Sequence, residues 1–173
     1  TLEGPRLTAT GAATADWIRQ SRPLARLLPG ITEYDDRRLV AQSLEALVQR
    51  MAGVWILFQQ GTATIQSPEQ LQGVRRISEL LHQLDDTAHL SGATVILEIT
   101  GQTDVVGRSS RNQRLSEDRA RSVLDALHPA TFSAITFHAR GIGPAPESSP
   151  SLGAATLPQD RRVSFQATVH PAS

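Results

Sequence analysis

The chain has 173 residues and a formal net charge of zero, with 17 basic and 17 acidic residues. This balance gives no electrostatic reason to expect nucleic acid or an anionic membrane as a partner. Aromatic residues make up only 4%, too few for a base-stacking surface. The absence of cysteine excludes disulfides and thiolate metal sites.

The first 53 residues predict a small unit and a connecting helix. A strand that ends at Gly11, a helix capped by Thr14 and a second strand from Ile31 form a β-α-β unit over residues 1–35. Apolar residues at helical spacing then predict an amphipathic helix over 36–53, which we expect to join this unit to the remainder.

Residues 54–173 predict strands that alternate with amphipathic helices. A helix start is clearest at Ser67, which is followed by Pro68 and by Gln70 in a capping-box pattern. A second capping box, Ser110 with Gln113, places the next helix start near 111. The expected strands cover 54–58, 95–100, 132–140 and 163–169, and residues 144–158 have the composition of a long loop.

Opposite charges converge at one end of this arrangement. Asp104 follows an apolar strand, and Asn112, Ser116 and Arg119 share one face of the next helix because they are four and three positions apart. Strand alternation brings Arg161 toward the same corner. An acid and an arginine across an open gap can clamp a zwitterion, the acid binding an ammonium and the arginine a carboxylate. From spacing alone, a structural salt bridge between the two is equally supported.

Four segments, in this order, resemble the signature of the OmpA-like C-terminal domain family: Gly101-Gln102-Thr103-Asp104-x-x-Gly107, Asn112-x-x-Leu115-Ser116-x-x-Arg119-Ala120-x-x-Val123, Gly141-x-Gly143 and Arg161-Arg162-Val163. The family includes peptidoglycan-associated lipoproteins and flagellar stator proteins. The resemblance covers roughly residues 54 to 170. It implies an α+β fold in which a β-α-β-α-β-β chain packs its helices on one face of a mixed sheet.

The resemblance also implies noncovalent binding of peptidoglycan. In family members the loop aspartate and helix arginine, which match Asp104 and Arg119, hold the diaminopimelate of the stem peptide. The asparagine and leucine that line the site match Asn112 and Leu115. The arginine of the final strand matches Arg161 or Arg162.

Three residues depart from the family pattern. Gln102 replaces a frequent histidine, and Asp160 replaces the asparagine that usually precedes the two arginines. Gln59 replaces an aspartate that commonly ends the first strand and lines the pocket. The loss of that carboxylate is expected to weaken recognition of an ammonium group.

The N-terminal unit has its own resemblance. Leu7-Thr8-Ala9-Thr10-Gly11 through Leu28-Pro29-Gly30-Ile31 is similar to half of a BON domain, a β-α-β module of some envelope proteins. The two tryptophans, Trp17 and Trp55, are expected to anchor cores, and the doublet Arg75-Arg76 is expected to be solvated surface charge.

Catalysis is not expected. The five histidines show no metal-ligand spacing, and neither a phosphate-binding loop nor a nucleophile elbow is present. A wall hydrolase would need a metal or a paired acid and base, which the sequence does not offer. No cofactor is therefore predicted.

The resulting hypothesis is that the chain is a periplasmic binding module, which binds peptidoglycan and tethers an envelope protein or complex to the cell wall. The alternative is a protein-interaction or oligomerisation module on an OmpA-like scaffold that has lost wall binding, with other envelope proteins or a second copy as partner. No run approaches the roughly 20 apolar residues of a membrane helix. We therefore expect the soluble part of a membrane-anchored protein, with any anchor outside this chain.

Overall fold

A computed structural model describes residues 2–13, 15–41, 43–144 and 158–171. The chain divides into two compact units, Thr1–Leu47 and Val48–Ser173. Helix α2 (Leu44–Ala52) contains the boundary between them.

The first unit is a three-stranded sheet with one helix. Its elements are β1 (Leu2–Glu3), β2 (Arg6–Ala13), α1 (Ala15–Ala25) and β3 (Glu33–Ala41). The sheet order is β1-β2-β3, and β2 and β3 are parallel, so α1 is the crossover of a β-α-β unit, as predicted. The Arg22–Asp36 ion pair, 2.6 Å long, and the hydrogen bond between the Ser21 and Tyr34 hydroxyls, 2.9 Å long, hold α1 to β3.

The helix predicted over 36–53 is wrong in its first part. Residues 36–41 belong to β3, which pairs with β2 through Ala41, and α2 begins only at Leu44. Three charged side chains of β3 form ion pairs within the unit, Arg37 with Asp35 at 2.6 Å and Asp36 with Arg22 at 2.6 Å, which offsets the cost of placing charge in the strand. Trp17 is also not a core anchor, since 45% of its surface is exposed.

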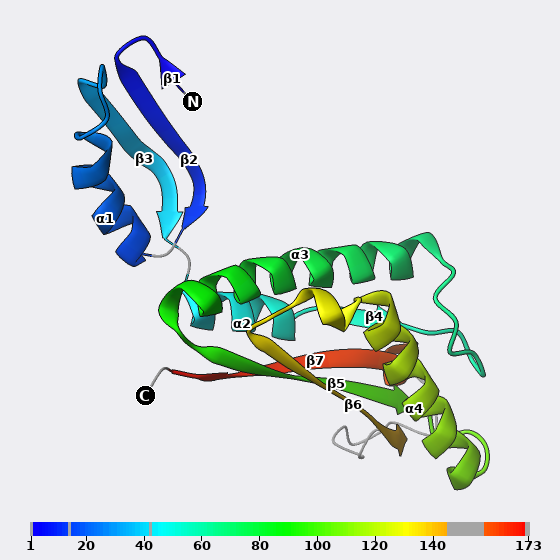
Figure 1. Ribbon diagram of the computed structural model, residues 1–173. Coiled ribbons are helices and arrows are strands. Elements are labelled where there is room, and N and C mark those ends of the chain that lie inside the picture. The colour runs from blue at the N-terminus through cyan, green and yellow to red at the C-terminus, as the bar shows by residue number, and fades with distance from the viewer. Residues whose placement is uncertain (1, 14, 42, 145–157, 172–173) are drawn as a thin grey trace. The chain divides into compact units, whose positions relative to one another are not determined.

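The second unit has the β-α-β-α-β-β order that the sequence predicts. Its elements after α2 are β4 (Trp55–Leu57), α3 (Pro68–Ser91), β5 (Thr94–Thr103), α4 (Ser109–Ala126), η1 (Pro129–Thr131), β6 (Ile135–Pro144), η2 (Pro158–Asp160) and β7 (Arg162–His170). The sheet order is β4-β7-β5-β6 (Figure 1). Strands β5 and β6 are parallel, whereas β7 is antiparallel to β5 and β4, so the sheet is mixed.

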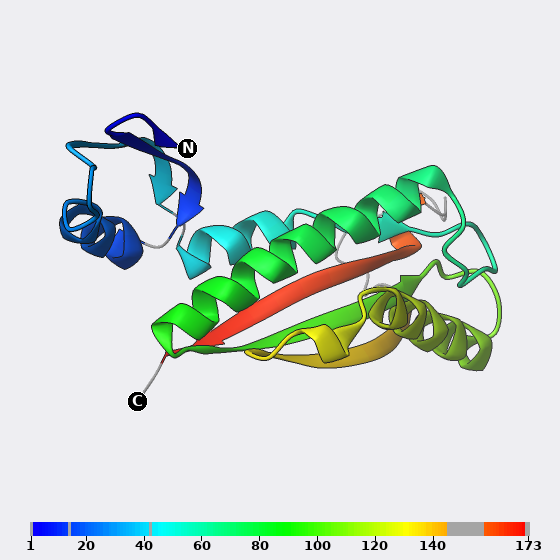
Figure 2. The ribbon, with the colours of Figure 1, turned by 45° about the horizontal axis from the view of Figure 1, so that its top comes forward.

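One face of this sheet forms the core. Val95, Leu97 and Ile99 of β5 are fully buried, and alternate residues of β7 from Val163 to Ala167 are buried beside them. Figures 1 and 2 show α3 and α4 covering the sheet. The α+β fold class with helices on one face is confirmed.

Helix α4 approaches the sheet closely because two strand positions lack a side chain. A Cβ on Gly101 of β5 would lie 2.0 Å from the Ser116 carbonyl oxygen, and one on Gly141 of β6 would lie 2.3 Å from the Glu117 nitrogen. The strand predicted over 95–100 is therefore too short, since β5 continues to Thr103 and Gly101 within it admits the helix backbone.

The two helix starts differ. Ser67 caps α3 in a capping box with Gln70, as predicted. Helix α4 instead begins at Ser109, and its N-cap, Arg108, makes no side-chain cap hydrogen bond. Gln113 does not complete a capping box but donates to the Gly141 carbonyl oxygen at 2.9 Å, which fixes α4 against β6.

Replacing Gly101 by Ala should lower the free energy of unfolding by about 3 kcal/mol, because the added methyl group collides with the α4 backbone. Gly73→Ala is the matched control. Its Cβ would meet the Ile56 side chain at 3.2 Å, and it should change stability by about 1 kcal/mol or less. Urea denaturation followed by circular dichroism measures both, and equal midpoints would contradict this packing.

Candidate functional site

The site is built around the guanidinium of Arg119 in α4. Its Nε donates to the Thr62 carbonyl oxygen at 2.8 Å, its Nη1 to that of Gln102 at 2.8 Å, and its Nη2 to that of Gln59 at 2.9 Å. Gln59 and Thr62 lie between β4 and α3, and Gln102 lies at the end of β5. One side chain therefore connects three separate parts of the second unit.

Arg119 is fully buried, with 0% of its surface exposed. Its guanidinium carbon lies 5.3 Å from the ring centre of Phe58, which is itself buried and offers a cation–π contact. Burial lowers the pKa of the Arg119 guanidinium to about 10; the nearby Asp104 opposes this shift and Arg161 adds to it. The guanidinium therefore carries its charge at neutral pH, together with the desolvation cost of that charge.

Asp104 lies beside Arg119, but its ion pair is with Arg161. Arg161 Nη1 lies 3.3 Å from Asp104 Oδ2, and Arg161 Nε lies 3.3 Å from the Phe58 carbonyl oxygen. Among the described residues, no carboxylate forms an ion pair with Arg119. The salt bridge between Asp104 and Arg119 that spacing alone allows is therefore not formed, and Asp104 pairs instead with Arg161, the residue before β7.

Asn112 and Arg162 complete the cluster. Asn112 Nδ2 donates to the Asp104 carbonyl oxygen at 3.2 Å and holds the loop after β5 against α4. Arg162 Nε donates to Gln102 Oε1 at 2.9 Å. The Arg162 guanidinium also lies 4.9 Å from the ring centre of Trp55, which is 52% exposed and so is not the core anchor predicted.

Leu115 lies apart from these polar groups. It is half-buried on α4 and borders a separate hollow of about 640 Å³. The other residues that border this hollow are Gly107, Arg108, Ser110, Arg111, Arg114 and Asp118. Five of the six predicted site residues thus converge through polar contacts, and the sixth borders an adjoining surface.

The cluster carries more positive than negative charge. Arg119 and Arg161 contribute two formal positive charges and Asp104 one negative charge, which leaves one positive charge uncompensated among these three. The Thr103 hydroxyl oxygen, beside Asp104, is buried without a hydrogen-bond partner among the described residues. An anionic group with hydrogen-bonding oxygens would complement both features.

The open gap expected from the sequence is not present. Asp104 is 5% exposed and Arg119 is completely covered, because the segment after β4 places its carbonyl oxygens on the guanidinium. These acceptors are backbone atoms, so no residue type marked them in the sequence. Phe58 was similarly visible only as part of an apolar strand.

Neither a membrane-spanning helix nor a metal-binding cluster occurs within residues 2–13, 15–41, 43–144 and 158–171. None of the helices there has both the length and the apolar character needed to span a bilayer. No group of three or more His, Cys, Asp or Glu side chains in these ranges could hold a metal ion.

This chain belongs to the OmpA family, whose sequence profile matches residues 57–146. It is 39% identical over 82 residues to outer membrane protein A of Serratia odorifera, covering 47% of this chain and 32% of that protein. It is 38% identical over 98 residues to outer membrane protein A of Klebsiella pneumoniae, covering 57% of this chain and 26% of that protein. The chain thus spans about a third or less of these relatives. The family is one of structural and binding proteins rather than enzymes, as predicted.

Solved structures of low identity are also similar. The peptidoglycan-associated lipoprotein from Burkholderia pseudomallei is 21% identical with a TM-score of 0.48, over 68% of this chain and 92% of that one. The C-terminal domain of Helicobacter pylori MotB is 18% identical with a TM-score of 0.49, over 66% of this chain and 83% of that one.

Arg119→Met should lower the free energy of unfolding by about 3 kcal/mol or more, because three carbonyl oxygens lose a charged donor. Arg121→Met, at an exposed position two residues along α4, should change it by less than about 0.5 kcal/mol. Urea denaturation compares the two variants. Equal stability would show that the Arg119 guanidinium does not hold these segments together.

Proposed function

We propose that the second unit binds the stem peptide of peptidoglycan noncovalently, through a diaminopimelate-type zwitterion, and that this binding tethers an envelope protein or complex to the cell wall. The cluster of Arg119, Asp104 and Arg161, with its excess positive charge, carries the proposal. Family membership supports it, as does the name of one structural relative, the peptidoglycan-associated lipoprotein.

In this proposal the ligand's carboxylate binds Arg119. A guanidinium has five N–H donors and three are used here, so one on Nη1 and one on Nη2 remain for an incoming anion. Access requires that the segment from Gln59 to Gln66 move aside, because its carbonyl oxygens cover the group. Gly61 in this segment has a φ of 73°, a left-handed turn conformation that favours glycine.

The ligand's ammonium binds Asp104. Its carboxylate is held by Arg161 at 3.3 Å, a long contact, so its oxygens can also accept hydrogen bonds from the ammonium. The extra positive charge of the cluster is offset by the ligand's carboxylate on Arg119. Asn112 fixes the backbone of Asp104, while Arg162 and Leu115 border the bound peptide. The proposal places the unit in the periplasm, where the wall is accessible.

The N-terminal unit is a separate part of the proposal. The parallel β2-α1-β3 arrangement has the β-α-β connectivity of half a BON domain, which supports the likeness proposed from its sequence. Because β3 runs to Ala41, the division of the chain that we propose extends the BON-like unit predicted over 1–35 to residue 41, follows it with a connecting segment that contains α2, and keeps the OmpA-like domain over 54–173.

A second candidate function is protein interaction or oligomerisation. It is favoured by apolar side chains on the N-terminal unit, where Leu24, Leu27 and Leu28 are 61%, 77% and 49% exposed. Leu24 and Leu28 line a mainly apolar hollow of about 370 Å³, together with Trp17 and Tyr34. The other proposed contact surface, residues 144–158, falls almost wholly outside the described residues. Self-association in sedimentation without any wall binding would favour this function.

Asp104→Asn and Arg161→Gln should each reduce binding to purified peptidoglycan about tenfold or more, because each removes a charge-assisted contact. They are preferable to Arg119 variants, since Arg119 also supports the fold. Pull-down by sedimented peptidoglycan measures the loss. Asp125→Asn, at an exposed position on α4 that does not border the Leu115 hollow, is the matched control and should bind like the parent. Unchanged binding by both site variants would contradict the proposal.

Gln59→Asp should strengthen binding of a diaminopimelate-containing tripeptide by up to roughly fivefold, because an exposed carboxylate beside the cluster adds an acceptor for the ammonium. The Gln59 side chain is exposed, while its carbonyl oxygen already contacts Arg119. Isothermal titration calorimetry provides the affinity, with Gln60→Asp as a control for added negative charge. Weaker binding by the Gln59 variant alone would show that the ligand's ammonium lies elsewhere.

A further inference from the structure

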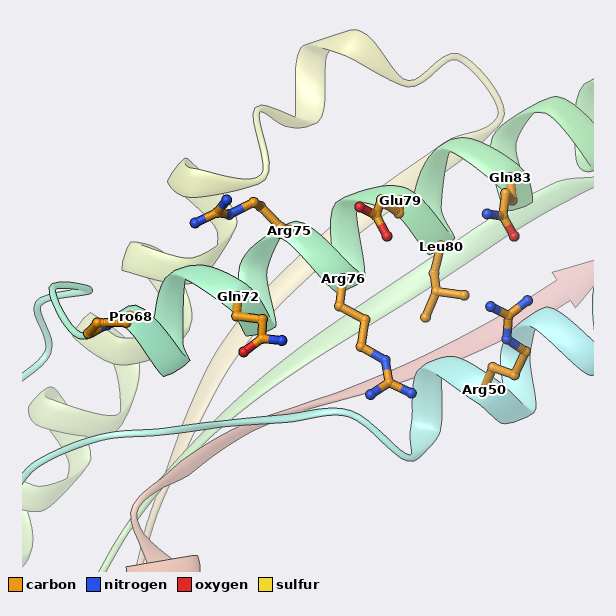
Figure 3. Close-up of a pocket in the computed structure, with 8 residues that line it drawn as sticks. All are labelled: Arg50, Pro68, Gln72, Arg75, Arg76, Glu79, Leu80 and Gln83. Carbon is orange, nitrogen blue, oxygen red and sulfur yellow. The ribbon is translucent and has the colours of Figure 1, made fainter.

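A second polar hollow lies on the OmpA-like unit, between α2 and α3, away from the Arg119 cluster. Its volume is about 630 Å³, within the range of small-molecule sites. The residues that line it are Arg50, Pro68, Gln72, Arg75, Arg76, Glu79, Leu80 and Gln83. Figure 3 shows these side chains along α3 and on the facing helix α2.

Two arginines from different helices face this hollow. Arg76 extends from α3 toward α2, and Arg50 extends from the last turn of α2 toward α3 (Figure 3). Arg75 lies at the outer rim on the other side of α3, and Gln72 lies on the same side as Arg76. The sequence alone predicted Arg75 and Arg76 to be separate solvated charges, because it does not show that α2 brings Arg50 opposite them.

The positive charge of this lining is not neutralised within the protein. Three arginines and one glutamate give a net formal charge of plus two. In the described part of the chain, Arg50, Arg75 and Arg76 make no side-chain hydrogen bond or ion pair, and Glu79 does not pair with either neighbour on α3. Exposed guanidiniums that line one hollow without a counter-ion attract an anion to the space between them.

The approach from two directions favours a phosphate over a carboxylate. A bidentate guanidinium fork uses one edge of a planar carboxylate, and further donors must approach in or near the same plane. A phosphate group offers three acceptor oxygens arranged around phosphorus, which guanidiniums can approach from different sides. The hollow is much larger than a single phosphate, so the anion would be attached to a carrier. Only Pro68 and Leu80 present an apolar lining, and Glu79 offers an acceptor for hydroxyl groups, so the carrier is polar rather than an acyl chain.

We propose that this hollow binds a phosphate monoester attached to a small polyhydroxyl group, with Arg50 and Arg76 holding the phosphate from opposite helices. Arg75, at the rim, adds long-range electrostatic attraction for the phosphate. The side-chain amide of Gln72 donates a hydrogen bond to the ligand. The same chemistry occurs in soluble sugar or glycerol phosphates and in a phosphomonoester lipid headgroup. This site is separate from the proposed wall-binding cluster and does not depend on it.

Calorimetric titration with glycerol 3-phosphate tests the proposal on the whole chain. The parent protein should bind it, and the double variant Arg50→Gln/Arg76→Gln should bind roughly tenfold more weakly or worse, because two charge-assisted contacts are removed. The control Arg26→Gln/Arg121→Gln removes the same charge from exposed positions outside the hollow and should bind like the parent. No binding by the parent, or an equal loss in both double variants, would overturn the proposal.

Co-sedimentation with phosphatidylcholine vesicles that contain phosphatidic acid distinguishes the two sources. If glycerol 3-phosphate binds and vesicle binding is lost only in the Arg50/Arg76 double variant, the proposal holds and the source is a lipid headgroup. If glycerol 3-phosphate binds while the vesicles do not, the proposal holds and the source is a soluble phosphate. Peptidoglycan pull-down should be unaffected by this double variant.

Discussion

The guanidinium of Arg119, buried against three backbone carbonyl oxygens, is the contact on which the candidate site depends. It fixes the segment after β4 to the end of β5, although these are far apart in the sequence. It can do so only because Gly101 and Gly141 let the α4 backbone lie directly on the sheet. A larger residue at either glycine would move α4 outward and withdraw the guanidinium from its acceptors, so fold and site share one constraint.

The same constraint explains how a structural group can also bind a ligand. A buried cation without a carboxylate partner is costly to desolvate, and the structure offsets that cost with carbonyl dipoles, with the Phe58 ring and with Asp104 nearby. An incoming carboxylate would replace neutral acceptors by a charged one. In the proposed function, the free energy gained in this exchange drives the movement of the segment that covers Arg119. The ion pair between Arg161 and Asp104 weakens at the same time, because the ligand's ammonium also binds Asp104.

The sequence was informative where function depends on side-chain type and spacing. The strand and helix order of the second unit and the convergence of Asp104, Asn112, Arg119 and Arg161 were predictable in this way, and the family resemblance added Arg162. It was uninformative where backbone atoms form the contacts that close the site. The carbonyl oxygens of Gln59 and Thr62 that close the site have no residue signature. Val40 falls on the apolar spacing of the following helix, yet pairing with β2 makes residues 36–41 part of a strand, since tertiary contacts override local periodicity.

The most direct measurement is a crystal structure of the protein in complex with a diaminopimelate-containing tripeptide. The account predicts a ligand carboxylate within hydrogen-bonding distance of Arg119, a ligand ammonium on Asp104, and displacement of the Gln59 or Thr62 carbonyl oxygen from the guanidinium. A structure in which the tripeptide binds elsewhere, while Arg119 keeps its three carbonyl acceptors and Asp104 keeps Arg161 alone, would contradict it.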